Sequence, residues 1–260
     1  MKINYNISYI SYTINLSYIC NLKPKKIKFS TKSKNLLNLK GKLKNAEVLD
    51  QLVINFKQFK KDSSIISKSI KRKKWDNISL IARSSSISED QDKSSKAGMF
   101  LTVSDIKGID EINSAVEKIF RSYHHVCYKD EVFIQPFLKK VKSSGVIFTR
   151  DINNNTPYIK INYDDSGGRC DAITSGTGKN NKLFFYHKLH KKKVKGTLGR
   201  LINLSIELEQ IFQNDSIDIE YVITNSGKLY LTQVRPLFIN YPKIISDNEH
   251  YDILLNIHRR

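Results

Sequence analysis

The sequence contains few cysteines and no long apolar run. Its three cysteines, Cys20, Cys127 and Cys170, lie far apart and form no C-x-x-C pair, so neither a zinc site nor a disulfide framework is predicted. This pattern is typical of a reducing cytoplasm, where we expect the protein to reside. Polar residues interrupt every apolar run within residues 1–30, and no later stretch approaches the ~20 apolar residues that span a bilayer. We therefore expect neither a secretory signal nor a membrane partner.

Acidic residues are scarce relative to basic ones. The 260 residues include 44 Lys and Arg against 25 Asp and Glu, which gives a formal net charge of +19. A field of this sign attracts polyanions such as nucleotides or nucleic acid. However, the chain is rich in Asn, Ile, Lys and Ser, and an AT-rich genome produces that mixture without selection for binding. The basic runs at 23–28 and 71–74 have no aromatic stacking platform beside them, so we expect no nucleic-acid partner.

Hydrophobic spacing predicts an α+β domain. The content of 40% hydrophobic residues suffices for a folded core. Apolar residues recur at helical spacing over 109–120 and 198–212. Short strand-like runs occur at 78–82, 132–134, 146–148 and 158–163. Residues 83–90 are predicted to form a polar loop and residues 164–180 a long Gly-rich loop. The mixed order lacks the regular alternation of a parallel sheet, which favours mostly antiparallel strands.

The most informative segment is S-I-D-I-E-Y-V-I-T-N-S-G-K-L-Y-L-T-Q-V-R-P-L at 216–237. Two alternating runs flank N-S-G-K, which predicts a β-hairpin. Whether the loop has two or four residues, the same register results. Glu220 then faces Gln233, and Asp218 faces Arg235. Because side chains alternate across a strand, all four polar groups are expected on one face of the ribbon.

Two carboxylates, an amide and a guanidinium on one sheet face are costly to desolvate unless they bind something. Magnesium takes carboxylate and amide oxygens and leaves positions for phosphate oxygens, while arginine holds phosphates through paired hydrogen bonds. An exposed hairpin with cross-strand salt bridges would have the same pattern, so both interpretations stay open. Likewise, R-S-S-S-I-S-E-D-Q-D-K-S-S-K-A-G-M-F at 83–100 could close over phosphates or form an ordinary Ser-rich surface loop.

Three ordered blocks of the sequence carry family motifs. The pattern R-S-S, E-D and S-x-A-G-x-F is matched by Arg83, Ser84, Ser85, Glu89, Asp90, Ser95, Ala97, Gly98 and Phe100. The pattern Q with S-G-V-x-F-T is matched by Gln135, Ser144, Gly145, Val146, Phe148 and Thr149. The pattern D-I-E with L-Y-x-x-Q-x-R-P is matched by Asp218, Ile219, Glu220, Leu229, Tyr230, Gln233, Arg235 and Pro236. A degenerate G-G-K-x-x-x-L is found in Ser30, Thr31, Lys32 and Leu36.

Together these blocks resemble the ATP-binding domain of pyruvate phosphate dikinases and phosphoenolpyruvate synthases, a member of the ATP-grasp group. The resemblance implies an ATP-grasp-like α+β fold with mostly antiparallel sheets and flanking helices, and it implies ATP and Mg²⁺ as cofactors. The implied ATP-binding residues are Lys32, Arg83, Gln135, Asp218 and Arg235, and the implied magnesium ligands are Glu220 and Gln233. Arg83 and Arg235 are the implied catalytic residues, because charge neutralisation provides most of the acceleration in phosphoryl transfer.

The family transfers the phosphoryl group to a histidine on a separate swivelling domain. Its T-S-H type segment and its phosphoenolpyruvate-binding barrel have no counterpart in this sequence. The histidines at 124–125, 187 and 190 lie in other contexts, and we expect them at the surface. The family's G-L-G-E loop is also replaced, by Y-D-D-S-G-G-R-C-D-A-I-T-S-G at 163–176. The acceptor is therefore expected on a phosphohistidine-domain partner or on C-terminal domains missing from this chain.

We predict an N-terminal extension at 1–28, an ATP-grasp-like nucleotide-binding domain at 29–240 and a C-terminal tail at 241–260. The expected function is that of an ATP-dependent phosphotransferase (kinase) domain. Two alternatives stay open from the sequence: a catalytically inactive nucleotide-binding module, and a basic nucleic-acid-binding protein with a fortuitous hairpin. Magnesium-dependent nucleotide binding separates the first two functions from the third, and phosphoryl transfer separates the first from the second.

Overall fold

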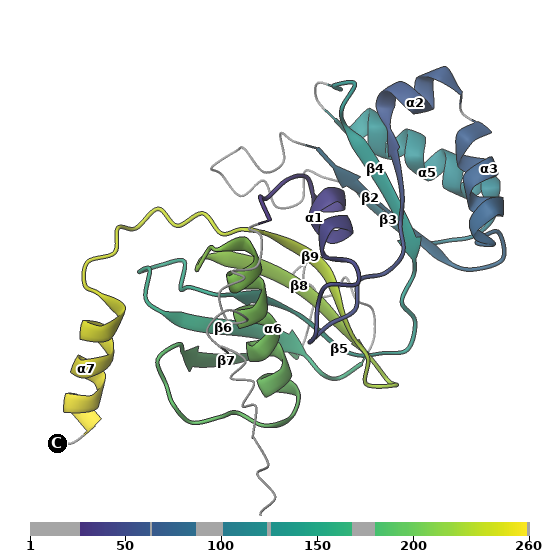
Figure 1. The fold of residues 1–260 in the computed structure, drawn as a ribbon. Coiled ribbons are helices and arrows are strands. Elements are labelled where there is room, and N and C mark those ends of the chain that lie inside the picture. The colour runs from purple at the N-terminus through teal and green to yellow at the C-terminus, as the bar shows by residue number, and fades with distance from the viewer. Residues whose placement is uncertain (1–26, 63, 87–100, 124–125, 168–179, 259–260) are drawn as a thin grey trace, which may run out of the picture.

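A computed structural model describes residues 27–62, 64–86, 101–123, 126–167 and 180–258 of the chain (Figure 1). Within these residues the strands form two antiparallel sheets, here called the small sheet and the large sheet, and helices pack against them. This arrangement confirms the predicted α+β class with mostly antiparallel strands. No helix in these described ranges is long and apolar enough to cross a membrane.

The elements follow the chain in a mixed order. The small sheet runs, in spatial order, β1 (Leu52–Asn55), β4 (Glu131–Pro136), β2 (Leu80–Ser85) and β3 (Thr102–Ile106). The large sheet runs β7 (Lys182–His187), β6 (Tyr158–Asp164), β5 (Val141–Phe148), β8 (Ile217–Thr224) and β9 (Leu229–Pro236). The helices are α1 (Lys32–Leu39), α2 (Phe56–Lys61), α3 (Ser64–Lys73), α5 (Ile109–Ser122), α6 (Gly196–Phe212) and α7 (Asp247–His258).

The large sheet buries one face against helix α6, which lies across it in Figure 1. Side chains alternate along a strand, so every second residue of β8 enters this core. Ile217, Ile219 and Tyr221 are fully or almost fully buried there. Asp218 and Glu220 therefore point to the opposite side of the sheet. We call that side the polar face.

Gly145 of β5 is required by close packing inside this sheet. It pairs with Tyr163 on one side and with Tyr221 on the other. A Cβ atom at this position would lie 2.8 Å from the Tyr221 hydroxyl oxygen and would also collide with a backbone carbonyl of β6. The S-G-V motif thus has a structural cause, because any larger residue would push strands apart next to β8.

Helices α2, α3 and α5 cover one face of the small sheet. The buried residues of α5 recur at helical spacing, and α3 adds Ile66 and Ile70 to the same cluster. Helix α2 begins with a capping box in which the Asn55 side chain accepts from the Gln58 amide at 2.8 Å. Phe133 lies on the other face of β4 and joins the core of the large sheet. The three helices therefore lie on the side of the small sheet that faces away from the large sheet.

Helix α1 connects the two sheets. The Asn35 side-chain amide donates a hydrogen bond to the Val234 carbonyl of β9 at 3.0 Å. The Ser33 backbone amide donates to the Ser85 hydroxyl of β2, also at 3.0 Å. These bonds fix the N-terminus of α1 between β2 and β9.

Several local predictions were wrong. Strand β2 continues through Arg83 to Ser85, which we expected to start a loop, because Ser84 and Ser85 pair with Val132 and Glu131 of β4. Strand β7 was not predicted, since L-F-F-Y does not alternate between apolar and polar residues. His187 was expected at the surface but is 7% exposed, because it stacks on His250 and Tyr251 of α7.

Candidate functional site

The β8–β9 hairpin brings the four predicted polar residues together. Asp218 pairs with Arg235, and Glu220 pairs with Gln233, as the sequence predicted. Directly opposed residues of antiparallel strands share a face, and residues two apart do the same, so all four side chains lie on the polar face. The hairpin geometry therefore confirms the predicted pairing.

The predicted pairing holds although the predicted loop was wrong. The Thr224 amide donates to the Lys228 carbonyl at 3.0 Å, which closes a loop of residues 225–227 with Gly227 at φ +80°. Compared with a loop of two or four residues, this three-residue loop shifts the pairing of β8 with β9 by one residue near the turn. A β-bulge between Glu220 and Tyr221 shifts it back. The extra residue of the bulge is Thr232 of β9, which has no partner in the register.

Asp218 is the most perturbed group of this site. Its side chain is buried, and Arg235 Nε donates to its Oδ2 at 2.7 Å. Burial raises the pKa of Asp218 to about 6, although the Arg235 guanidinium opposes the shift and the Glu220 carboxylate adds to it. Oδ1 of Asp218 is buried as well and accepts no hydrogen bond in the part of the chain that the structure describes. The carboxylate is thus held in place with one oxygen still unused.

Two cations reach the hairpin from other elements. Lys32, the first residue of α1, lies close enough for its charge to lower the pKa of Asp218. Arg83 of β2 donates from Nη1 to the Thr232 carbonyl at 3.1 Å. The β-bulge thus provides the carbonyl that anchors Arg83, although 149 residues separate the two positions in the sequence. Both predicted phosphate-binding cations accordingly lie beside β8 and β9.

Gln135 lies apart from these groups, on strand β4 of the small sheet. It pairs with Ile81 of β2 and is 2% exposed. Its Nε2 is buried and donates no hydrogen bond within the described ranges. A buried amide donor without an acceptor is costly, so this group is available for a ligand that brings an acceptor.

Sequence reasoning missed Glu131, which organises the start of α1. This buried carboxylate accepts hydrogen bonds from the Thr31 hydroxyl at 3.0 Å and the Ser33 hydroxyl at 2.5 Å. Lys34 Nζ lies 3.1 Å from its other oxygen. These contacts hold Lys32 next to the polar face. The signal in the sequence was an acidic residue directly before the buried run V-F-I of β4, a position where a charge needs partners.

Part of the first family block lies outside the described residues, namely Glu89, Asp90, Ser95, Ala97, Gly98 and Phe100. Within the described ranges, no group of three or more His, Cys, Asp or Glu side chains could hold a metal ion. The polar face carries a different set of possible oxygen ligands, namely two carboxylates and one amide.

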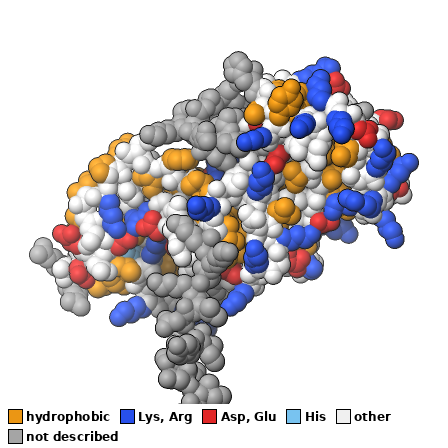
Figure 2. Space-filling model, turned by 45° about the horizontal axis from the view of Figure 1, so that its top comes forward, with side chains coloured by type: hydrophobic (Ala, Val, Ile, Leu, Met, Phe, Trp, Pro, Cys, Tyr) orange, Lys and Arg blue, Asp and Glu red, His pale blue; other side chains and the backbone are white. Residues whose placement is uncertain are grey.

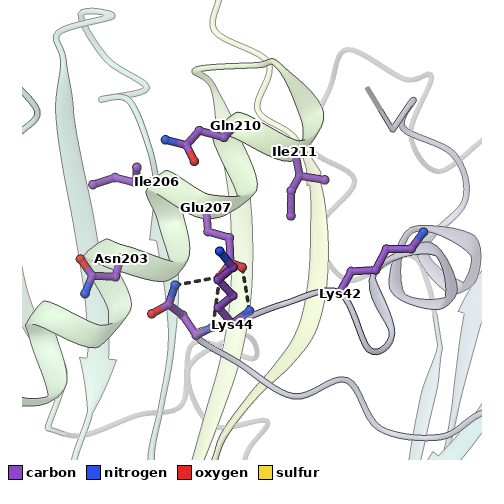
Figure 3. A pocket seen from close by; sticks show the side chains of 8 residues that line it. Lys42, Lys44, Asn203, Ile206, Glu207, Gln210 and Ile211 are labelled. Atoms are coloured by element: carbon purple, nitrogen blue, oxygen red, sulfur yellow. Dashed lines mark hydrogen bonds between the residues drawn. The ribbon is translucent and has the colours of Figure 1, made fainter. Parts of the chain in front are cut away.

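A surface pocket lies elsewhere, beside α6 (Figure 3). It is lined by Lys42, Lys44 and Asn45 of the loop after α1 and by outward residues of α6. Its one carboxylate, Glu207, accepts hydrogen bonds from the Lys44 and Asn45 amides at 2.7 and 3.1 Å. Glu207 thus holds the loop after α1 against α6, and this structural role explains why a carboxylate lies in the pocket. It lies on the α6 side of the large sheet, away from the polar face.

No model of a known protein family matches the sequence, and no curated protein matches it. Several solved structures are similar to parts of this chain. The D-alanine-D-alanine ligase from Coxiella burnetii shares 14% identity at a TM-score of 0.41, covering 85% of this chain and 50% of that one. The VanG D-Ala:D-Ser ligase from Enterococcus faecalis shares 10% identity at 0.42, covering 86% and 59%.

A third similar structure is the Chryseobacterium gregarium RiPP-associated ATP-grasp ligase in complex with ADP and a leader and core peptide. It shares 10% identity at a TM-score of 0.43, covering 78% of this chain and 50% of that one. The chain thus spans about half the length of these structures. Its fold class rests on the two sheets described above.

Proposed function

We propose that residues 29–240 form an ATP-grasp-like domain that binds ATP with magnesium on the polar face and transfers a phosphoryl group. The observation that carries this proposal is the hairpin register. It sets Asp218, Glu220, Gln233 and Arg235 on one face, at the place where α1 and β2 bring in two further cations. A nucleotide bound to its metal is a ligand that uses both kinds of group, because its phosphates would interact with the cations and its metal with the carboxylates.

The donor set fits magnesium. Asp218 has a buried oxygen without a partner in the described chain, and Glu220 lies two residues along the same face. Glu220 and Gln233 would hold the ion and Asp218 would complete its surroundings, which leaves positions for phosphate oxygens. When bound, the ion would neutralise charge that develops on the transferred phosphoryl group.

The cations around the hairpin fit the phosphates. Arg235 and Arg83 present planar guanidinium groups suited to paired hydrogen bonds, whereas Lys32 adds a point charge at the start of α1. Gln135 fits the adenine, because its buried Nε2 can donate to a ring nitrogen. In this scheme the protein's own contribution is to position the nucleotide and to compensate its negative charge.

The phosphoryl acceptor in this proposal is a histidine on a separate domain or partner, as in the pyruvate phosphate dikinase and phosphoenolpyruvate synthase families. Among the described histidines, His187 and His250 are stacked on each other at the far edge of β7. Such a packed pair is poorly placed to receive a phosphoryl group from the β8–β9 hairpin. The chain would then bind the ATP that donates the phosphoryl group to this acceptor.

Isothermal titration with Mg²⁺ and ATP tests nucleotide binding. We expect Glu220→Gln and Arg235→Ala each to weaken magnesium-dependent ATP binding at least about tenfold, because hydrogen bonds to charged groups contribute about 1.5–3 kcal/mol. Glu117→Gln and Arg121→Ala provide matched controls, since this exposed pair lies on α5. Unchanged affinity in both hairpin variants would contradict the proposed site.

Labelled ATP tests the transfer itself. Incubation with a phosphohistidine domain encoded near this chain should produce an acid-labile, base-stable phosphoprotein. Mg·ATP binding without any transfer would instead support the alternative of an inactive nucleotide-binding module.

A further inference from the structure

Helices α2 and α3 form an unusually basic surface. Residues 57–74 contain eight Lys or Arg and a single acidic residue, Asp62. Figure 2 shows Lys and Arg side chains spread over the part of the molecule that contains these helices. We call this surface the α2–α3 face.

The packing of both helices turns their charges toward solvent. Helix α3 buries Ile66 and Ile70, so Lys68, Lys71 and Arg72 lie on its opposite, exposed side. Helix α2 packs Phe56 and Phe59 against Phe120 of α5, which leaves Lys57 and Lys61 exposed. The α2–α3 face therefore rests on a hydrophobic cluster that packs against its inner side.

Few of these charges are neutralised. Lys68 pairs with Asp62 at 3.2 Å, and Lys73 pairs with Asp50 at 2.6 Å. Within the described ranges, ion pairs are absent for Lys57, Lys60, Lys61, Lys71, Arg72 and Lys74. A set of like charges on one face costs repulsion unless an anion compensates it.

Neighbouring helices of this layer differ in charge. Helix α5 belongs to the same layer but carries both signs, with Asp110 and Glu111 in its first turn. Its Arg121 pairs with Glu117 one turn away. Within this layer the excess of positive charge is therefore confined to α2 and α3.

The chemistry of the α2–α3 face selects among anionic partners. A membrane-binding helix inserts large apolar side chains, and the core of a protein interface is rich in apolar and aromatic residues. Exposed large hydrophobic side chains are absent from residues 56–74 in the described chain. The face thus offers charge alone, which is what a phosphodiester backbone requires.

We propose that the α2–α3 face binds the phosphate backbone of double-helical nucleic acid without sequence preference. The sequence argued against nucleic acid because no aromatic platform accompanies the basic runs, but stacking platforms serve single strands. A duplex hides its bases and needs only phosphate contacts. The face lies on the far side of the small sheet from the polar face, so this binding is independent of the proposed nucleotide site.

Fluorescence anisotropy with labelled DNA and RNA duplexes of about 20 base pairs tests the proposal, measured between about 50 and 200 mM salt. The variant Lys57→Gln with Lys61→Gln and Lys71→Gln removes three exposed charges. Its matched control, Lys191→Gln with Lys192→Gln and Lys193→Gln, removes three exposed charges from the loop after β7. Both variants lower the net charge equally.

We expect the α2–α3 variant to bind duplexes about tenfold more weakly, with a salt slope reduced by about 2 to 3 because each lost phosphate contact contributes ~0.7–0.9. The control should keep the wild-type slope, and both variants should bind Mg·ATP like the wild type. Equal loss in the two variants, absence of duplex binding by the wild type, or equally charge-dependent binding to anionic phospholipid vesicles would each overturn the proposal.

Discussion

Strand β8 belongs to two environments at once. Its α6-facing side carries Ile217, Ile219 and Tyr221, which fill the core of the large sheet. Its other side carries Asp218 and Glu220, and burial penalises the charge of Asp218. Substitution should therefore separate the two sides: changes in the core should cost stability, whereas changes on the polar face should cost ligand binding and can even increase stability.

The largest effect is expected in the core. Ile219 is 0% exposed and lies between Ile147 and Val234 of the neighbouring strands. Ile219→Ala should lower the free energy of unfolding by about 2–5 kcal/mol, because it removes buried methylene groups and leaves a cavity. Urea denaturation measures the change. A loss below about 1 kcal/mol would show that this side of β8 is not a tightly packed core.

A smaller effect of opposite sign is expected one residue away. Asp218→Asn keeps the side-chain shape but removes a buried charge with an unpartnered oxygen. At pH 8 we expect an increase of about 1 kcal/mol in the free energy of unfolding, together with loss of magnesium-dependent ATP binding, a trade-off that is common at functional sites. A destabilised variant with intact binding would reverse the interpretation of the two faces.

The attachment of α7 to His187 of β7, the edge strand of the large sheet, should depend on pH. The Leu189 amide donates to His187 Nδ1 at 3.2 Å, so neutral His187 carries its proton on Nε2 and donates to His250 Nδ1, also at 3.2 Å. A second proton on either ring would set two donors against each other. Burial and the charge of His250 lower the pKa of His187, while Asp247 opposes this shift and His190 adds to it.

Because the pKa of His187 is lowered, the protein binds fewer protons when α7 is docked than when α7 is released. Docking should therefore be complete above the ordinary histidine pKa of about 6.5 and should weaken as the pH falls below it. Limited proteolysis between residues 237 and 258 from pH 8 to pH 5 should detect the release. His187→Phe should remove the pH dependence and His190→Gln should keep it. Equal cleavage at both pH values in the wild type would contradict this prediction.

The smallest effect is expected at the turn of the same hairpin. Lys228 and Glu47 form an exposed ion pair at 3.2 Å. Lys228→Ala should change the free energy of unfolding by less than about 0.5 kcal/mol, since exposed pairs contribute little. It should also leave Mg·ATP binding intact. Loss of binding in this variant would mean that the polar face extends to the turn.

The sequence predicted the pairing of Asp218 with Arg235 for a partly incorrect reason. The loop has three residues, and the bulge at Glu220 compensates for it. The prediction rested on the alternation along both strands, because a one-residue slip would have moved Ile217, Ile219 and Tyr221 out of the core. A β-bulge has no clear signal in a single sequence, so the bulge could not be predicted.

Other parts could not be predicted because they depend on distant partners. The first turn of α1 depends on Glu131, which lies about 100 residues later in the chain. Helices α2 and α3 are short and lysine-rich, so their segments resemble solvated runs until they pack on the hydrophobic cluster that includes Phe120 of α5. His187 was predicted at the surface because its cover, α7, lies 63 residues away in the sequence.

The most direct test of the account locates the metal. Mn²⁺ in place of Mg²⁺, added with ATP to the isotopically labelled protein, broadens NMR signals of nearby amides. We predict selective broadening at Asp218 to Glu220 and at Gln233 to Arg235, with the pocket beside α6 unaffected. Broadening around Lys42 and Glu207 that spares the hairpin would contradict the assignment of the polar face as the nucleotide site.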